Sequence, residues 1–161
     1  MIVIALTKID GVIFIMSKPL WNIDESLIKL LLQAQKAVRH RVDRKLEEAG
    51  FDLSVPQAMI LVFLKESSCC NQKELGDLVV CDKTSITRTI KMLEKRKLVK
   101  WKPNKNDRRQ KLVYITRKGN ELAVMLWRVI ESAVTEVERG IDVKKRSTSK
   151  EVLKAIQLNL S

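Results

Sequence analysis

Apolar residues recur at spacings of three and four from Asn22 onward, which is the periodicity of an amphipathic helix. A capping box that starts at Asn22 begins this first helix, and Gly50 ends it. A second helix is predicted to start at Ser54, where Gln57 completes another capping box. A loop at 66–70 is expected to end it. The chain from Asn22 to about residue 66 is therefore predicted to be helical.

The middle of the chain has the pattern of two short helices and a hairpin. Asn71 begins a capping box for a third helix, and Asp82 can cap a fourth helix that carries one apolar stripe. Two short helices joined by a tight turn are typical of a helix-turn-helix, here at about 71–97. In the segment 98–116, a polar, turn-forming stretch separates a short run at 98–101 from a run at 111–116 in which side chains alternate between two faces. This pattern predicts a β-hairpin, or wing. The winged helix-turn-helix is thus expected at 54–116.

Two further helices are predicted after the wing. The first covers about 117–139 and ends near Gly140, and the second is expected to start at a capping box from Thr148. Long amphipathic helices in 22–50 and 117–161 leave apolar faces that one chain does not cover. We therefore predict a mainly α fold with a small β-wing (α+β), in which these helices form a dimerisation region.

Residues 1–21 form an N-terminal extension ahead of this 22–161 domain. Two β-rich runs flank Asp10-Gly11 and are consistent with a hairpin; alternatively Met16 is the natural start and 1–15 are translated upstream sequence. Charged residues divide the apolar run into pieces too short to cross a bilayer. The segment does not show the features of a signal peptide, which are a basic start, a longer uninterrupted apolar core and a small-residue cleavage site. We expect no stable membrane insertion and a cytoplasmic location.

Composition changes the picture through its charge. The 161 residues carry a formal net charge of +12, which predicts an acidic partner. Residues 83–118 contain 14 lysines and arginines and only two acids, whereas the rest of the chain is neutral as a set. A charge that serves solubility alone would be spread more evenly. The excess therefore points to one charged surface on the fourth helix and the wing.

The sequence has little material for catalysis or for a metal site. It contains one histidine and three cysteines without CxxC spacing, so a Ser-His-Asp triad, a zinc ribbon and a disulfide framework are disfavoured. No enzymatic activity, cofactor or metal is predicted. Cys81 is a redox candidate because the start of the fourth helix could lower its pKa.

Residues Asn71 to Gly119 closely resemble the winged helix-turn-helix of MarR/SlyA-type bacterial transcription regulators. The most specific element is the wing signature formed by Asp107, Arg109, Ile115 and Thr116. The resemblance implies a homodimer that grips a pseudo-palindromic operator and often senses a small aromatic or phenolic effector. It also implies that Asp107 holds Arg109 by a salt bridge. Asn104 and Trp101 depart from the residues common at their positions.

The resemblance places the fourth helix in the major groove of double-stranded DNA and the wing in the minor groove. Arg88 is expected to read a base, because a guanidinium can bond guanine O6 and N7 together. Ser85 and Thr87 are expected at phosphates. The predicted contacts include, on the third and fourth helices and at the wing tip, Gln72, Lys73, Lys83, Thr84, Ser85, Thr87, Arg88, Lys91, Arg108 and Arg109.

The favoured function is a sequence-specific transcriptional regulator, acting as a ligand-responsive repressor. An architectural or anti-silencing DNA binder without an effector is the alternative, and the two differ in their specificity ratio. Peripheral membrane binding through the apolar N-terminus is a third hypothesis. An enzyme is the least favoured, because no acid–base constellation or phosphate loop is present.

Overall fold

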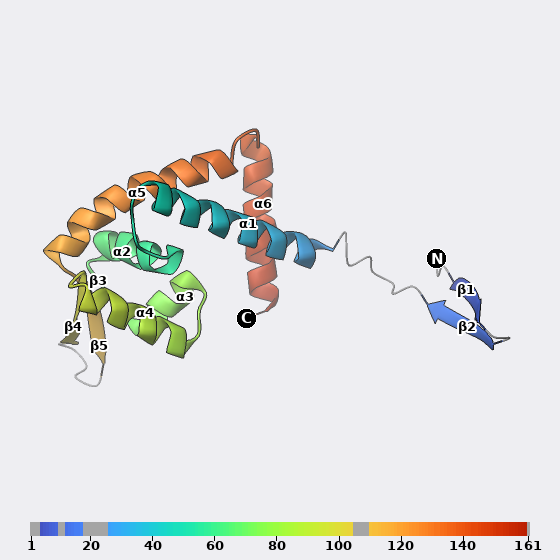
Figure 1. Cartoon of the computed structure of the whole chain (residues 1–161), viewed down its shortest axis with the longest axis horizontal. Coiled ribbons are helices and arrows are strands. Elements are labelled where there is room, and N and C mark those ends of the chain that lie inside the picture. Colours follow the sequence, from blue (N-terminus) through green and yellow to red (C-terminus); the bar gives the residue numbers. More distant parts are fainter. Residues whose placement is uncertain (1–3, 10–11, 18–25, 105–109, 161) are drawn as a thin grey trace. The chain divides into compact units, whose positions relative to one another are not determined.

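The computed structural model describes residues 4–9, 12–17, 26–104 and 110–160 (Figure 1). The chain divides into two compact units, Met1–Ala37 and Val38–Ser161, and helix α1 (Leu27–Glu48) runs through the boundary. In the first unit, strands β1 (Ile4–Ile9) and β2 (Val12–Ser17) pair antiparallel. The capping box expected at Asn22 lies outside the described residues.

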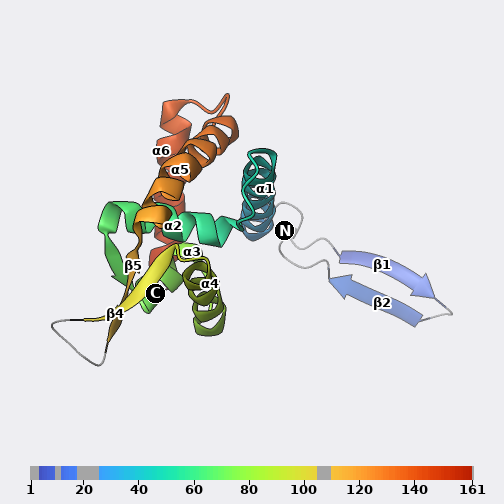
Figure 2. The same cartoon turned by 60° about the vertical axis from the view of Figure 1, so that its left-hand side comes forward.

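The second unit is mainly helical with a small sheet, which confirms the predicted fold class. Its further elements are α2 (Val55–Ser67), β3 (Cys69–Asn71), α3 (Gln72–Val79), α4 (Lys83–Lys95), β4 (Val99–Pro103), β5 (Lys111–Ile115), α5 (Arg117–Val137) and α6 (Val143–Asn159). The three-stranded antiparallel sheet has the order β3-β5-β4, and Figure 2 shows β4 and β5 extending from it as a hairpin.

The loop predicted at 66–70 is wrong except at Ser68, because α2 continues to Ser67 and a strand follows at once. Cys69–Asn71 forms strand β3, in which Cys70 pairs with Val113 of β5. That partner lies far along the chain, so no local pattern marks the strand. The result is a sheet that joins the start of α3 directly to the base of the wing.

The core of the second unit lies between α2, α5, the sheet and the buried faces of α3 and α4. Ile60, Leu61 and Leu64 of α2 are fully buried, as are Ile86, Ile90 and Leu93, the apolar stripe predicted for α4. Helix α2 packs against α5, α3 and α4. Burial of the stripe fixes which face of α4 is left to solvent.

The start of α5 is tied to the base of the wing. The Thr116 amide donates to the Leu98 carbonyl (3.0 Å), and its hydroxyl donates to the Lys97 carbonyl (2.8 Å). The same hydroxyl oxygen accepts from the Gly119 amide (3.0 Å) and caps α5. Gly119 is buried against Leu98, and a Cβ at this position would lie 2.1 Å from the Leu98 carbonyl oxygen. Only glycine permits this approach without a shift of the backbone.

Helix α6 is capped six residues before the predicted cap at Thr148. Asp142 caps it, since its carboxylate accepts from the Lys145 amide (2.9 Å), and Thr148 therefore lies inside the helix. The box from Thr148 fitted the local pattern, but the earlier cap already starts the helix. Arg146 on α6 pairs with Glu138 beyond the end of α5 (2.6 Å).

Apolar side chains remain uncovered on the last two helices. Helix α6 buries none of its described residues. The exposed large apolar residues of α5 and α6 include Val124, Met125, Trp127, Val134, Val137, Val143, Val152, Leu153 and Leu158. In the described residues, no helix combines the length and the hydrophobicity needed to cross a bilayer.

Candidate nucleic-acid interface

A strained turn and a strong cap set the direction of α4. Val80 ends α3 in the left-handed conformation (φ 50°, ψ 58°), which is unusual for a β-branched residue. Two residues later, one oxygen of the Asp82 carboxylate accepts from the amides of Thr84 (2.8 Å) and Ser85 (2.9 Å). The other accepts from the Ser85 hydroxyl (2.6 Å), and this bond is the main reason that the pKa of Asp82 is lowered. The predicted cap of the fourth helix is therefore present.

The exposed face of α4 carries the cations expected there. A groove of about 620 Å³ runs along it, and its lining consists of Lys83, Thr84, Thr87, Arg88, Lys91, Met92 and Lys95. All but Thr87 are exposed. Within the described part of the chain, Lys83, Arg88 and Lys91 form no ion pair, whereas Arg41 pairs with Glu136 and Arg117 with Glu121. The face thus presents uncompensated positive charge to solvent.

Gln72 at the start of α3 is connected to α4. Its side-chain amide donates to the Thr87 hydroxyl (2.6 Å) and lies 3.3 Å from the Lys83 carbonyl oxygen. The Thr87 hydroxyl in turn donates to that carbonyl (2.6 Å). Two predicted DNA contacts, Gln72 and Thr87, are therefore brought together, and their polar groups already bond to each other.

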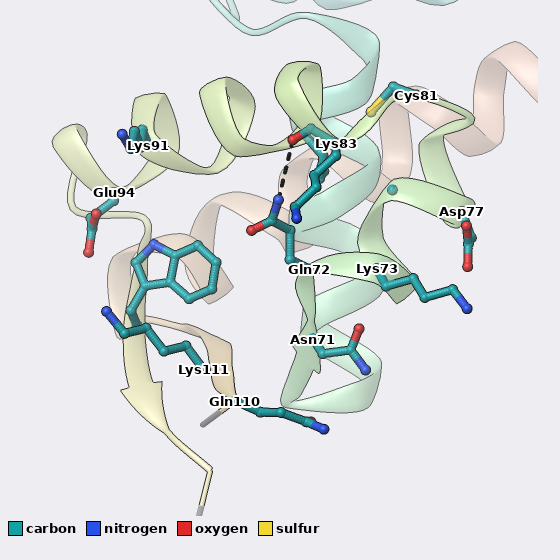
Figure 3. A pocket seen from close by; sticks show the side chains of 13 residues that line it. Asn71, Gln72, Lys73, Asp77, Cys81, Lys83, Lys91, Glu94, Gln110 and Lys111 are labelled. Atoms are coloured by element: carbon teal, nitrogen blue, oxygen red, sulfur yellow. Dashed lines mark hydrogen bonds between the residues drawn. The ribbon is translucent and has the colours of Figure 1, made fainter. Parts of the chain in front are cut away.

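A larger cleft opens beside this connection. It has a volume of about 1100 Å³ and lies between α3, α4 and the wing strands. Figure 3 shows Gln72 reaching toward the start of α4, with Gln110 and Lys111 of the wing on the other side. Its lining carries Lys73, Lys83, Lys91 and Lys111 against Asp77 and Glu94. The cleft joins α3, α4 and the wing into one surface with an excess of positive charge.

The wing strands bring further cations beside α4. Asn104 donates its amide to the Gln110 carbonyl (2.9 Å), which closes the hairpin, and Lys102 lies 5.2 Å from the centre of the Tyr114 ring. Trp101, one of the departures from the family pattern, is half-buried and lines the cleft. The predicted tip residues Asp107, Arg108 and Arg109 lie outside the described residues.

The structure qualifies several predicted contacts. Lys73 is exposed at the start of α3 and lines the cleft. Ser85 is exposed, but its hydroxyl hydrogen is already donated to Asp82. Sequence reasoning missed Lys95 and Met92 in the groove. Their spacing of seven and four residues from Arg88 could have identified them, because that spacing repeats on one helical face.

The prediction that the start of α4 lowers the pKa of Cys81 is wrong. Partial burial raises this pKa, and the neighbouring Asp82 carboxylate adds to the effect. Burial and a hydrogen bond to Glu74 likewise raise the pKa of the Cys70 thiol, to about 12. Both thiols are thus less ionised than ordinary cysteines. Among the described residues, no group of three or more histidine, cysteine or acidic side chains could hold a metal ion.

Comparison with known proteins gives one consistent result. Residues 53–111 match the model of the MarR family. The chain is 30% identical over 93 residues to the HTH-type transcriptional regulator PrsX of Escherichia coli, which is 58% of this chain and 56% of the relative. The chain therefore matches little more than half the length of this curated relative.

Solved structures extend the likeness over the flanking helices. One belongs to BpsR of Bordetella bronchiseptica, whose DNA binding is regulated by 6-hydroxynicotinic acid (TM-score 0.75, 20% identity, 85% of this chain and 96% of that one). Another is a putative MarR family regulator from Listeria monocytogenes in complex with a 26mer DNA (TM-score 0.73, 26% identity, 84% and 89%). The shared fold includes the winged helix-turn-helix and the long terminal helices.

Proposed function

Because residues 53–111 match the model of the MarR family, we propose that this chain is a sequence-specific regulator of transcription that binds double-stranded DNA. It acts as a homodimer on a pseudo-palindromic operator, and a small molecule controls its binding. Repression is the proposed direction of control. The relative from Listeria monocytogenes that carries DNA supports the choice of partner.

The observation that carries this proposal is the uncompensated charge on α4. Lys83, Arg88 and Lys91 face solvent along one groove and form no ion pair within the described residues. Phosphate contacts by such groups supply affinity, and contacts to base edges supply specificity. Arg88, near the middle of the exposed face, is proposed to read guanine.

The proposal of a homodimer rests on the apolar side chains left exposed on α5 and α6. Trp127 is 50% exposed and Leu158 is 77% exposed in the single chain. A second copy of the chain would cover such residues and remove their cost in water. Symmetric dimers also match the symmetry of palindromic DNA, with half-sites about 34–36 Å apart.

Control by an effector rests on the relatives. The DNA binding of BpsR is regulated by 6-hydroxynicotinic acid, and CouR from Rhodococcus jostii has been solved with p-coumaroyl-CoA. Both ligands are aromatic and carry a phenolic or hydroxylated ring. We therefore propose an effector of this class for the present chain.

Selection of bound sequences from random duplexes tests the proposal directly. The expected result is one enriched pseudo-palindrome that gives a single footprint. A plot of log association constant for the selected duplex against log salt concentration should have a slope of about −0.9 for each phosphate contacted. Graded protection of all DNA would instead favour an architectural protein, and a flat salt dependence would contradict the electrostatic argument.

Two arginine variants separate α4 from the rest of the surface. Arg88→Ala should weaken binding by about 1–3 kcal/mol per half-site and relax specificity at one position. Arg128→Ala removes an exposed arginine of α5 and should leave specificity unchanged. Analytical ultracentrifugation at micromolar concentration should give twice the mass of the chain. A monomer that binds DNA as tightly would refute the dimer.

A further inference from the structure

One side chain in the groove along α4 is not polar. Met92 is 50% exposed and lies in the same groove as Thr84, Arg88 and Lys91. It follows Arg88 by four residues, so the two share one face of α4. Exposure of an apolar side chain to water is unfavourable. An apolar side chain surrounded by cations is therefore suited to a partner that offers an apolar group with anionic groups around it.

Met92 is also held in place by a contact with the buried Gln57 of α2. Gln57 of α2 is the one buried polar residue among the described ones, with 5% of its surface exposed. Its carbonyl oxygen accepts from the Ser54 amide (3.1 Å), and its amide nitrogen donates to the Met92 sulfur (3.7 Å). A methionine is otherwise flexible, and sulfur is a weak acceptor that still satisfies a buried donor. The thioether is thus presented to the groove in a defined position.

We propose that Met92 recognises the 5-methyl group of a thymine in the operator. This inference rests on the proposed function, since it needs α4 in the major groove. Thymine is the base that presents a methyl group there, and apolar contact is how proteins read it. Met92 lies about 6 Å beyond Arg88 along the helix axis, given a rise of 1.5 Å per residue. With base pairs about 3.4 Å apart, the thymine lies within about two base pairs of the base that Arg88 contacts.

Replacement of single thymines by deoxyuridine tests this contact, because it removes the methyl group and nothing else. The selected duplex is used with each symmetric pair of thymines replaced in turn, and dissociation constants are measured by fluorescence anisotropy. For the unaltered protein, replacement of one particular pair of thymines should weaken binding about fourfold per half-site. This is the free-energy cost of losing the burial of one methyl-sized group. With both half-sites altered, the expected loss is about 15-fold.

Three variants assign the loss to Met92. Met92→Gln should bind the thymine and deoxyuridine duplexes with equal affinity, whereas Met92→Leu, which stays apolar, should retain the preference for thymine. Lys95→Gln is the matched control from the same groove: it should weaken both duplexes alike and keep their ratio.

Two results overturn different claims. If selection yields no preferred sequence, the proposed function fails and this inference fails with it. If a preferred sequence is found, but no thymine pair is sensitive or the sensitivity survives in Met92→Gln, only the role of Met92 is refuted. Loss of the thymine preference in Met92→Gln, with its retention in Met92→Leu and Lys95→Gln, establishes the contact.

Discussion

The two glycines inside helices α3 and α5 allow a matched test of the packing at the base of the wing. Gly119 and Gly76 are both buried helical residues, so Gly→Ala should favour the helix at each by up to about 1 kcal/mol. They differ in what an added Cβ would meet. At Gly119 it would lie 2.1 Å from the Leu98 carbonyl oxygen and 3.0 Å from an Ile115 side-chain carbon. At Gly76 the nearest atom is the Cys81 carbonyl oxygen at 3.4 Å, an ordinary contact.

The magnitude follows from the clash. Overpacking of a core costs about 1–3 kcal/mol, and the atom in the way at Gly119 belongs to the backbone, which cannot rotate aside. The same Leu98 carbonyl accepts from the Thr116 amide (3.0 Å), so moving it also strains that bond. Because the blocking atom is backbone, the clash should cost about 3 kcal/mol, the upper end of this range. Subtracting the helix gain of about 1 kcal/mol, we expect Gly119→Ala to destabilise the protein by about 2 kcal/mol and Gly76→Ala to change stability by less than about 1 kcal/mol.

Urea denaturation followed by circular dichroism measures both values. The protein concentration is held constant across variants, because association with a second copy would add to the apparent stability. Unchanged m-values would show that the folded states are equally compact. If Gly119→Ala proved as stable as the unaltered protein, or less harmful than Gly76→Ala, the steric reasoning at the base of the wing would be refuted.

Further predictions concern strain, charge and thiol chemistry. Val80→Gly should stabilise the protein by about 1 kcal/mol in the same assay, because glycine adopts the left-handed conformation without a clash; a loss of stability would contradict this. The pKa of Glu136 is lowered from 4.5 to about 2, chiefly by the hydrogen bonds from Arg41, so the stability it contributes is present above pH 4.5 and lost as the pH falls toward 2. Glu136→Gln should therefore reduce stability at pH 7 and have little effect near pH 2, and an equal loss at both would refute the ion pair's role. At pH 8, iodoacetamide should label Cys70 and Cys81 more slowly than free cysteine, since both pKa values are raised; denaturation in urea should abolish the difference, and fast labelling of the folded protein would contradict the assignment.

The elements that the sequence predicted well are those whose signals are local. Asn71 and Glu74 form their capping box within one helical turn, and Asp82 caps α4 through residues two and three positions away. The stripe of α4 follows from helical periodicity, and burial of the stripe determines the exposed face. The same periodicity predicts that Lys83, Arg88 and Lys91 lie off the stripe, and all three are exposed.

The elements that were missed depend on residues distant in sequence or on competing local signals. Strand β3 exists because Cys70 pairs with Val113, and the contact of Gln57 with Met92 joins residues 35 positions apart. For α6, Asp142 and Thr148 both start plausible caps, and the pattern does not say which one begins the helix. The pKa of Cys81 depended on burial, which outweighed the proximity of a helix start.

The bonds at the two ends of the wing have an evolutionary consequence. Thr116 fastens the base of the hairpin to Leu98, and the bond between Asn104 and Gln110 closes it again just before the tip. Both bonds join backbone groups of residues outside positions 105–109. Loop-closure entropy grows slowly, by about 0.6 kcal/mol for each doubling of length. Substitutions and insertions at these positions that leave both bonds in place are thus expected to cost little folding free energy. Under the proposed function, DNA preference could then diverge while the domain stays intact.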